Sequence, residues 1–325
     1  TKRPDRVRFE FDGPPGTLLQ LQRSVAVHRV RHLNIPRPKT LLGHQYFEIL
    51  VELLQIPLNL HPRESFQTFN VSAAGSESSV FARIKSQIKK RTGLLLDEVA
   101  GDLAIAVRRP QRFSARTRRG PRGWEIVVRL SPRPLATRPW RICDMPGALN
   151  GTVASIMMSL TQPSEKDCVV NLACGSGTLL IERLALARVW RAIGCDIDPQ
   201  ALNCARQNLA ASGYGETVRL LRCDAGQVPL PNACTSSVCA DLPFGMLVGS
   251  HQGNEILYPR LVNEASRLVV SGGWLVIITQ EVKLFERVIR AQARQWKVKQ
   301  IVPVKLPANT RSGYIRPRIY LCQRR

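Results

Sequence analysis

The segment "CVVNLACGSGTLLIERL", Cys168–Leu184, decides the fold. It begins with a short apolar run, turns through two glycines, and continues with the apolar spacing of an amphipathic helix. A buried strand that passes through a glycine-rich turn into a helix is the opening unit of a doubly wound α/β domain. We therefore predict a strand over residues 168–173 and a helix over residues 178–190.

The residues that follow repeat this alternation. Strands are predicted at 192–196, 218–223, 237–240 and 274–279, with helices at 199–213 and 256–269. Strands that alternate with helices form right-handed βαβ units and a mostly parallel sheet. The chain ends differently, because "VKQIVPVKL" and "RPRIYLCQ" are joined by a loop too short for a helix. The sequence thus predicts a Rossmann-like α/β domain whose seven-stranded mixed sheet ends in an antiparallel hairpin.

The N-terminal half has a less regular pattern. Short strands are predicted at 7–11 and 24–30, helical pieces at 41–54 and 79–92, and a strand pair at 99–107 and 124–130. This order indicates one small α+β module, or two in tandem. The segment "LSPRPLATRPWR" is rich in proline and polar residues, which is typical of a linker. We expect domains at 1–63, 64–141 and 142–325.

The charge of the chain indicates its partner. Among 325 residues, 47 Lys and Arg oppose 24 Asp and Glu, for a net charge of +23. Residues 1–141 hold 26 of the basic and 11 of the acidic side chains. Such an excess favours a polyanion bound by the N-terminal half, and nucleic acid above all. A surface charged for solubility is the alternative, and charge alone does not separate RNA from DNA.

The nine cysteines all lie beyond residue 142. They form no C-x-x-C pair, no histidine cluster accompanies them, and several lie in apolar runs, where cysteine acts as a small hydrophobe. This pattern argues against a structural zinc site and favours a reducing compartment, for which we expect the cytoplasm. No apolar run is long enough to span a bilayer.

Candidate binding sites follow three consecutive predicted strands: a glycine turn after the first and acidic residues after the second and third. The turn at Gly175 and Gly177 exposes backbone N–H groups that suit a carboxylate or phosphate, although any tight turn can need such glycines. Asp196 ends the second strand, where an acid can bind the two hydroxyls of a ribose; Asp198 competes for that role or caps the next helix. Asp224 ends the third strand and can accept a hydrogen bond from an adenine amino group. Together they predict a nucleoside-like cofactor.

The fourth strand ends in "DLPF", Asp241–Phe244. A flipped-out base needs an aromatic face, which Phe244 can supply. Its exocyclic amine needs acceptors, which the Asp241 carboxylate and the Leu242 carbonyl can supply. The alternative is a strand that simply ends in an acid and a buried phenylalanine.

Residues 142–325 resemble the class I S-adenosylmethionine-dependent methyltransferases, on the strength of "NLACGSGT", "GCDIDPQAL" and "LRCDAGQ". The resemblance implies S-adenosylmethionine as cofactor. Asn171 replaces the acid that this family usually has at the start of the loop. The implied cofactor-binding residues are Asn171, Ala173, Gly175, Ser176, Gly177, Thr178, Asp196, Ile197, Asp224 and Ala225.

The "DLPF" segment resembles the motif of the amino-methyltransferases, in which an Asn or Asp precedes two prolines and an aromatic residue. Leu242 replaces the first proline, but the role there belongs to a backbone carbonyl. The implied catalytic residues are Asp241, Leu242, Pro243 and Phe244. Guanine presents N1–H and N2–H₂ side by side, and a carboxylate can accept both. The resemblance and this chemistry imply methyl transfer to guanine N2.

Residues 64–141 resemble the THUMP RNA-binding domain, preceded by a ferredoxin-like module. The combination is similar to the tRNA guanine-N2 methyltransferases, and "DLPFG", "GSH" and "LYP" are most like those acting at position 6. It implies that a monomer binds the acceptor stem and 3′ end of tRNA. Position-10 methylation of tRNA, methylation of rRNA, and a non-catalytic RNA-binding scaffold remain alternatives. The expected phosphate contacts are Lys85, Lys89, Lys90, Arg108, Arg109, Arg112, Arg116, Arg118 and Arg119.

Overall fold

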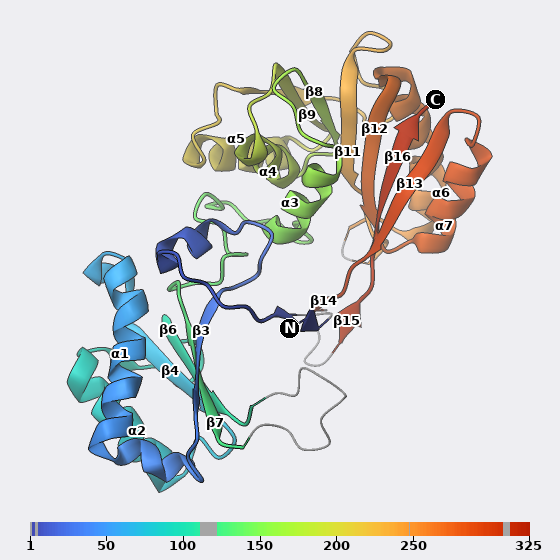
Figure 1. Ribbon diagram of the computed structural model, residues 1–325. Helices are drawn as coiled ribbons and strands as arrows, with labels where there is room; N and C mark the ends of the chain where they lie inside the picture. Colours follow the sequence, from blue (N-terminus) through green and yellow to red (C-terminus); the bar gives the residue numbers. More distant parts are fainter. Residues whose placement is uncertain (1, 4–5, 111–121, 247, 308–312) are drawn as a thin grey trace. The chain divides into compact units, whose positions relative to one another are not determined.

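The computed structural model describes residues 2–3, 6–110, 122–246, 248–307 and 313–325 (Figure 1). The chain divides into two compact units, Thr1–Ala136 and Thr137–Arg325. This single division lies five residues before the linker boundary that we expected at 141, and residues 1–63 are not separated from 64–136. The domain boundaries that we expected at residues 63 and 141 therefore stay predictions.

The C-terminal unit is built on a seven-stranded sheet in the order β10-β9-β8-β11-β12-β16-β13. All neighbours are parallel except β16, which runs antiparallel to both β12 and β13. The predicted fold class is confirmed, hairpin included. The strands are β8 (Cys168–Leu172), β9 (Arg191–Asp196), β10 (Val218–Arg222), β11 (Thr235–Asp241), β12 (Val269–Thr279), β13 (Trp296–Pro303) and β16 (Arg318–Arg324).

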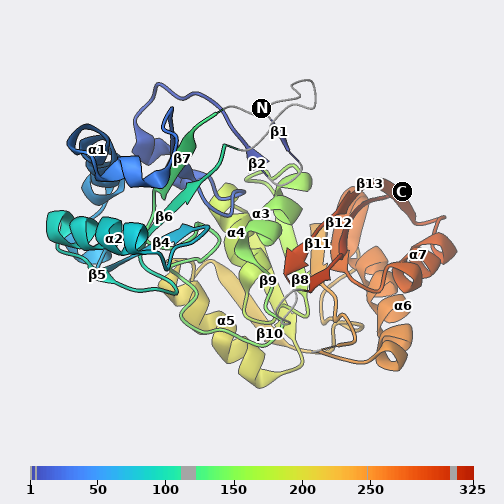
Figure 2. The same cartoon turned by 90° about the horizontal axis from the view of Figure 1, so that it is seen from below.

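Helices cover both faces of this sheet (Figures 1 and 2). Successive strand residues point to opposite faces, so Val169 packs beneath one helix layer and Val170 beneath the other. On one side lie α3 (Gly151–Leu160), α4 (Thr178–Leu186) and α5 (Pro199–Ala211); on the other lie α6 (His251–Leu268) and α7 (Val282–Ala291). Helices α3 and α7 were not predicted, and α6 begins five residues earlier than expected, at a Ser250 N-cap.

The strand order reverses between β8 and β11. The chain passes from β8 to β9 and β10 in one direction, and from β11 to β12 in the other. In open α/β sheets, ligands bind at the carboxyl ends of the strands beside this switch point. The glycine turn follows β8 and the "DLPF" segment follows β11, so the fold brings both predicted motifs to the switch point.

The N-terminal unit has a five-stranded sheet, β3-β7-β6-β4-β5, against which two long helices pack in one core. Predicted helix 79–92 coincides with α2 (Ser79–Thr92). The strand predicted at 24–30 is displaced, because β3 aligns by its register with β7. The strand predicted at 7–11 is wrong beyond Val7. The elements are β1 (Lys2–Arg3), β2 (Arg6–Val7), β3 (His28–Leu33), α1 (His44–Leu60), β4 (Thr68–Ala73), β5 (Leu95–Leu96), β6 (Leu103–Arg108), β7 (Trp124–Arg129) and the 3-10 helices Pro15–Gln20, Pro38–Leu42 and Arg63–Ser65.

Two cysteines form a disulfide, Cys143–Cys204, whose Cα atoms are 5.4 Å apart. The other seven are thiols, five of them buried. A disulfide is unexpected in a chain that we predicted to work in a reducing compartment. Within the described residues, no group of three His, Cys, Asp or Glu side chains is placed to hold a metal ion. Among the described helices, none has the length and apolar content needed to cross a membrane.

Candidate active site

The turn between β8 and α4 has an unusual backbone. Ala173, Gly175 and Gly177 all have positive φ angles, of 50°, 53° and 80°. This region favours glycine and costs a side-chain-bearing residue such as Ala173 about 1 kcal/mol. A Cβ built on Gly175 meets no protein atom within 4 Å, so open space borders the turn there. Backbone strain and open space together are the features of a loop shaped around a ligand.

Asp196 connects the end of β9 to this turn. One carboxylate oxygen accepts a hydrogen bond of 2.9 Å from the Gly175 N–H, and the other accepts one of 3.0 Å from the Asp198 N–H. Asp198 caps α5, since its side chain accepts from the Gln200 N–H at 2.8 Å. The cap was our alternative reading of Asp198. Asp196 is thus the acid that lies against the turn, with the remaining lone pairs of its oxygens available to hydroxyl groups.

Asp224 lies at the end of the neighbouring strand, β10. Its Oδ1 accepts from the Gly226 N–H at 2.8 Å, and its Oδ2 pairs with Arg260 at 2.8 Å. These hydrogen bonds lower the pKa of Asp224, so it is an anionic acceptor. Ile197, beside Asp196, is 67% exposed and offers an apolar surface, whereas Ala225 is buried. An exposed apolar side chain beside Asp196, with a second acid at the end of the neighbouring strand, suits a nucleoside, whose base stacks and whose hydroxyls and amine donate.

Asn171 is buried and joins two strands. Its amide nitrogen donates to the Cys239 carbonyl of β11 at 3.1 Å and to the Leu172 carbonyl at 3.2 Å. Its Oδ1 has no hydrogen-bond partner among the described residues. An acid at this position could not donate to Cys239. Asn171 therefore closes the seam between β8 and β11 and leaves one acceptor next to the turn.

Ser176 and Thr178 begin α4, and an arginine that we did not predict joins them. The two hydroxyls are 3.2 Å apart, and the Thr178 hydroxyl accepts from Arg141 at 3.0 Å. Arg141 also donates to the Leu149 carbonyl at 2.6 Å and pairs with Asp144. It places a positive charge at the amino end of α4, where the exposed N–H groups already favour an anion. No local sequence signal places Arg141 at the start of α4, because its contact with Thr178 spans 37 residues.

These residues fit S-adenosylmethionine. An amino acid carboxylate fits the turn, which is open at Gly175, and the N-terminus of α4 beside Arg141. A ribose and an adenine fit the acids at the ends of β9 and β10. Asp196 and Asp224 would hold the ribose and the adenine, and the turn and Arg141 would hold the methionyl end.

Asp241 ends β11, beside the turn after β8. Its Oδ1 is buried and has no hydrogen-bond partner among the described residues. Burial raises the pKa of its carboxyl from 3.8 to about 7. A buried acceptor without a donor is costly in a folded protein, and such groups concentrate where a ligand completes them. Burial thus brings the pKa of the Asp241 carboxyl close to neutrality, and Asp241 lies where the sequence predicted the target amine.

The backbone of the "DLPF" segment is held from α6. The carbonyl of Pro243 accepts hydrogen bonds from Asn254 at 2.8 Å and from the Tyr258 hydroxyl at 2.7 Å. Both donors are buried. The Leu242 carbonyl, by contrast, accepts no hydrogen bond from any described residue, while the Leu242 N–H is bonded to Ile278 of β12 at 3.1 Å. This arrangement leaves the predicted carbonyl acceptor available next to Asp241.

Phe244 is half-buried and packs partly against the core beneath α3. After it, Gly245 turns with a φ of 73°, and its N–H bonds to the Val248 carbonyl at 3.1 Å. His251 and Glu281 form an ion pair of 2.9 Å at this turn, which raises the pKa of His251. Asn254, Tyr258 and this pair were not predicted as site residues, although "GSH" and "LYP" were noted as family-like and contain His251 and Tyr258.

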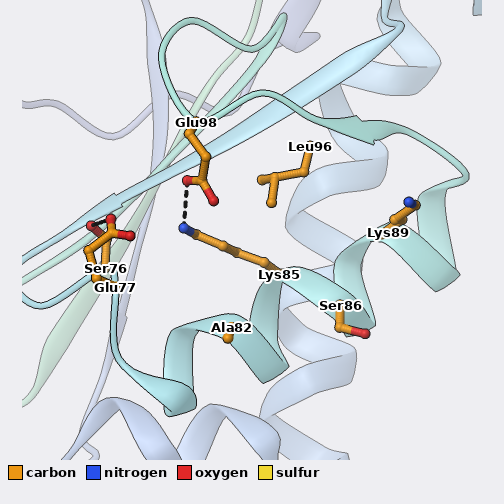
Figure 3. A pocket seen from close by; sticks show the side chains of 8 residues that line it. All are labelled: Ser76, Glu77, Ala82, Lys85, Ser86, Lys89, Leu96 and Glu98. Atoms are coloured by element: carbon orange, nitrogen blue, oxygen red, sulfur yellow. Dashed lines mark hydrogen bonds and ion pairs between the residues drawn. The ribbon is translucent and has the colours of Figure 1, made fainter.

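The predicted RNA contacts of α2 separate into two kinds. Lys89 and Lys90 are exposed, whereas Lys85 is buried and its ammonium pairs with Glu98 at 2.6 Å. The side chains of Lys85, Lys89 and Glu98 line a cavity of about 310 Å³ (Figure 3). A buried, paired ammonium is not available to a phosphate, so the assignment of Lys85 is corrected to a structural one.

The predicted arginines are only partly described. Arg108 is half-buried and lies 3.5 Å from the buried Glu125. Arg109 stacks on the Trp124 ring at 4.4 Å from its centroid and donates to the Gly123 carbonyl. Arg112, Arg116, Arg118 and Arg119 lie outside the described residues. Phe81 is buried in the core of the N-terminal unit, and Trp124 packs against it.

Comparison with protein families and known proteins adds to this geometry. Residues 138–311 match the family model described as "RMKL-like, methyltransferase domain". A mouse tRNA (guanine(6)-N(2))-methyltransferase THUMP3 is 28% identical over 55% of this chain and 37% of its own length. The chain thus matches well under two thirds of that relative.

Two matches from Thermus thermophilus, one to a sequence and one to a solved structure, cover more of the chain. A tRNA (guanine(6)-N2)-methyltransferase of Thermus thermophilus is 25% identical over 82% of this chain and 78% of its own length. The crystal structure of TrmN from Thermus thermophilus superposes with a TM-score of 0.66 and 20% identity, covering 98% of this chain and 88% of that one. This likeness extends the shared fold to the N-terminal unit.

Proposed function

Because the chain belongs to the RMKL-like methyltransferase domain family, we propose that it transfers a methyl group to the N2 atom of a guanosine in tRNA. One observation carries the proposal: the half-buried Asp241, with its raised pKa and its buried, unpartnered Oδ1, lies beside the Leu242 carbonyl at the switch point of the sheet. The names of the mouse and Thermus relatives support guanine, and position 6 of the acceptor stem.

The geometry indicates how the chain would perform this reaction. S-adenosylmethionine supplies an electrophilic methyl group. Asp241 and the Leu242 carbonyl accept hydrogen bonds from the N2 amine and align its lone pair, and most of the rate comes from this alignment. S-adenosylmethionine would release its methyl group to N2 and keep the sulfonium bond electrons as a thioether, and N2 would then carry one proton too many. Asp241, with a pKa of about 7, is poised to accept that proton near neutral pH.

The basic N-terminal unit would bind the RNA. Its exposed Lys89 and Lys90 on α2 support this, as does the charge excess of residues 1–141. We propose that this THUMP-like unit binds the acceptor stem and 3′ end of tRNA, that the protein acts as a monomer, and that it works in the cytoplasm.

The direct test is product identification. The protein is incubated with unmodified tRNA transcripts and S-adenosylmethionine carrying an isotopically labelled methyl group, and the RNA is digested to nucleosides for mass spectrometry. We expect labelled N2-methylguanosine, and none with Asp241→Ala. Fragment analysis then distinguishes position 6 from position 10. A labelled adenosine would overturn the choice of base. Absence of label on tRNA, with labelled rRNA under the same conditions, would move the substrate to rRNA.

A non-catalytic scaffold is tested separately. Binding of S-adenosylmethionine stabilises the folded state by mass action, so the melting temperature of the C-terminal unit should rise with its concentration. No shift at millimolar concentration would favour a scaffold.

A further inference from the structure

A short hairpin extends beyond the last residue pair of β13 and β16, Pro303 and Arg318. β14 (Leu306–Pro307) and β15 (Tyr314–Ile315) pair antiparallel and continue β13 and β16 past the end of the sheet (Figure 1). The Val304 N–H bonds to the Pro317 carbonyl at the base of this hairpin. We call the described residues 304–307 and 313–317 the arm. Neither the cofactor site nor the proposed chemistry uses them.

The arm leaves the sheet at the edge where Asp241 lies. Across the sheet, Asp241 is paired with Ile278, and Ile278 with Ile319. Neighbouring strands are about 4.8 Å apart, so Ile319 lies about 10 Å from Asp241 in the plane of the sheet. One step further along, Gln280 accepts a hydrogen bond of 3.0 Å from the Arg316 N–H. The arm is therefore attached to the segment that follows the strand next to Asp241.

The exposed side chains of the arm, an aromatic ring and two cations, are of the kinds with which proteins bind single-stranded nucleic acid. Tyr314 is 60% exposed, and the Lys305 ammonium lies 3.8 Å from the centre of its ring. Arg316 is exposed as well. Neither Lys305 nor Arg316 has an acidic partner among the described residues, and the arm itself contains no Asp or Glu. Nearby Glu286 is already paired with Arg318 and Tyr320.

An exposed aromatic ring beside two cations favours a partner that is anionic and has flat apolar faces. A solvated hairpin would not need an exposed tyrosine, and a neutral or basic protein surface would leave Lys305 and Arg316 without an anionic partner. Bases stack on aromatic rings and phosphates pair with Lys and Arg. An enzyme that draws one base out of a stack must hold the nucleotides beside it, because unstacking costs a few kcal/mol.

We propose that the arm binds the RNA segment next to the target guanosine, with Tyr314 stacking on a neighbouring base and Lys305 and Arg316 contacting phosphates. This inference rests on the proposed function, since it takes RNA as the substrate. It adds a substrate-binding surface on the methyltransferase unit itself, separate from the basic residues of the N-terminal unit.

The test compares the arm with matched positions on the same strand pair. Lys297 lies on β13 opposite Gln323, near the end of the strand that is farthest from the arm, and is exposed like Lys305. We would measure tRNA affinity by filter binding across a salt series and the single-turnover rate of methyl transfer. The variants are Tyr314→Ala, Tyr314→Phe, the pair Lys305→Ala/Arg316→Ala, and the control Lys297→Ala. Binding of S-adenosylmethionine, read from thermal shift, checks that each variant is folded.

We expect Tyr314→Ala to weaken tRNA binding by roughly ten-fold, while Tyr314→Phe stays close to wild type. The Lys305→Ala/Arg316→Ala pair should lower the slope of log affinity against log salt by about two. Lys297→Ala should change neither. If the arm variants bind tRNA as Lys297→Ala does, while the wild-type protein forms N2-methylguanosine, the proposal for the arm is wrong and the proposed function stands. A wild-type protein that neither binds nor methylates RNA would instead overturn the proposed function, and the arm with it.

Discussion

The hydroxyl of Tyr258 donates a 2.7 Å hydrogen bond to the carbonyl of Pro243, across 15 residues of sequence. Thr279 lies 2.7 Å from the same hydroxyl and itself accepts from the Glu281 N–H. Because Tyr258 uses its only proton on Pro243, Thr279 must donate to Tyr258. Burial raises the pKa of Tyr258, so this donor is retained across the working pH range. The network ties the "DLPF" backbone to α6 and β12.

Tyr258→Phe should therefore affect catalysis as well as stability. The substitution removes two buried hydrogen bonds, to Pro243 and from Thr279, and should cost about 2 kcal/mol of stability. A looser Pro243 also misplaces the Leu242 carbonyl, so we expect the rate of methyl transfer to fall roughly ten-fold with little change in cofactor affinity. Tyr320→Phe is the control, because its hydroxyl donates to Glu286 in the same unit at 2.9 Å. Equal rate losses in both variants would remove Tyr258 from the positioning of the motif.

The rate of methyl transfer should follow the ionisation of Asp241. The carboxylate is the form that accepts from the amine, and its pKa is about 7. Raising the pH from about 6 to about 8 should then increase the single-turnover rate by about ten-fold. Asp241→Asn should be slower, with a flat profile over this range. A wild-type profile that is equally flat would show that Asp241 does not limit the reaction.

The same carboxyl should make stability depend on pH. Its folded-state pKa is raised, so the folded chain keeps the proton up to about pH 7, whereas the unfolded chain releases it near 3.8. Ionising Asp241 therefore opposes folding, and this cost grows as pH rises from about 4 to about 7. Asp241→Asn should melt at a higher temperature than wild type above pH 7, with the difference vanishing near pH 4. The opposite trend would mean that Asp241 has a partner in solution.

Gly175→Ala should weaken binding of S-adenosylmethionine. The control is Gly213→Ala, since both glycines have positive φ and neither has a protein atom within 4 Å of an added Cβ. Each substitution should cost about 1 kcal/mol of stability through the backbone. Only Gly175→Ala should lower cofactor affinity, as measured by calorimetry, because its Cβ enters the open side of the turn. Equal affinities would place the cofactor away from this turn.

On α2, exposed and buried lysines should behave differently. Lys89→Ala and Lys90→Ala should each reduce the salt dependence of tRNA binding and leave the melting temperature of the N-terminal unit unchanged. Lys85→Ala should lower that melting temperature, since it removes the pair with Glu98 and buried packing, and leave the salt slope unchanged. A salt slope that responds to Lys85 alone would reverse this assignment.

The number of free thiols tests the disulfide directly. Denatured without reductant, the chain should present seven reactive thiols of nine, and nine after reduction. Reduction should lower the stability of the C-terminal unit by about 4 kcal/mol if loop entropy accounts for the bond. Nine thiols without reductant, from protein purified in air, would show that Cys143 and Cys204 stay reduced, as our compartment prediction requires.

Local patterns in the sequence determined the fold of the C-terminal unit. The alternation of apolar runs with helical spacing predicted the order of the sheet strands along the chain and the helices α4, α5 and α6, though not α3 or α7, and the glycine turn located the first βα unit. Topology then followed, because the handedness of βαβ connections leaves few arrangements and brings the carboxyl ends of neighbouring parallel strands to one edge. For that reason Asp196, Asp224 and Asp241 were predicted together, and the structure places them at the ends of β9, β10 and β11.

The tertiary structure alone decided which groups complete the site. Arg141 reaches Thr178, Tyr258 reaches Pro243, and the raised pKa of Asp241 comes from burial. It also separated Lys85 from Lys89, which share one helix and one charge. Burial and contacts between distant residues depend on how whole layers pack, and a local pattern does not contain that information. Periodicity therefore predicts which face of an element is apolar, while packing determines the partner that a polar group meets there.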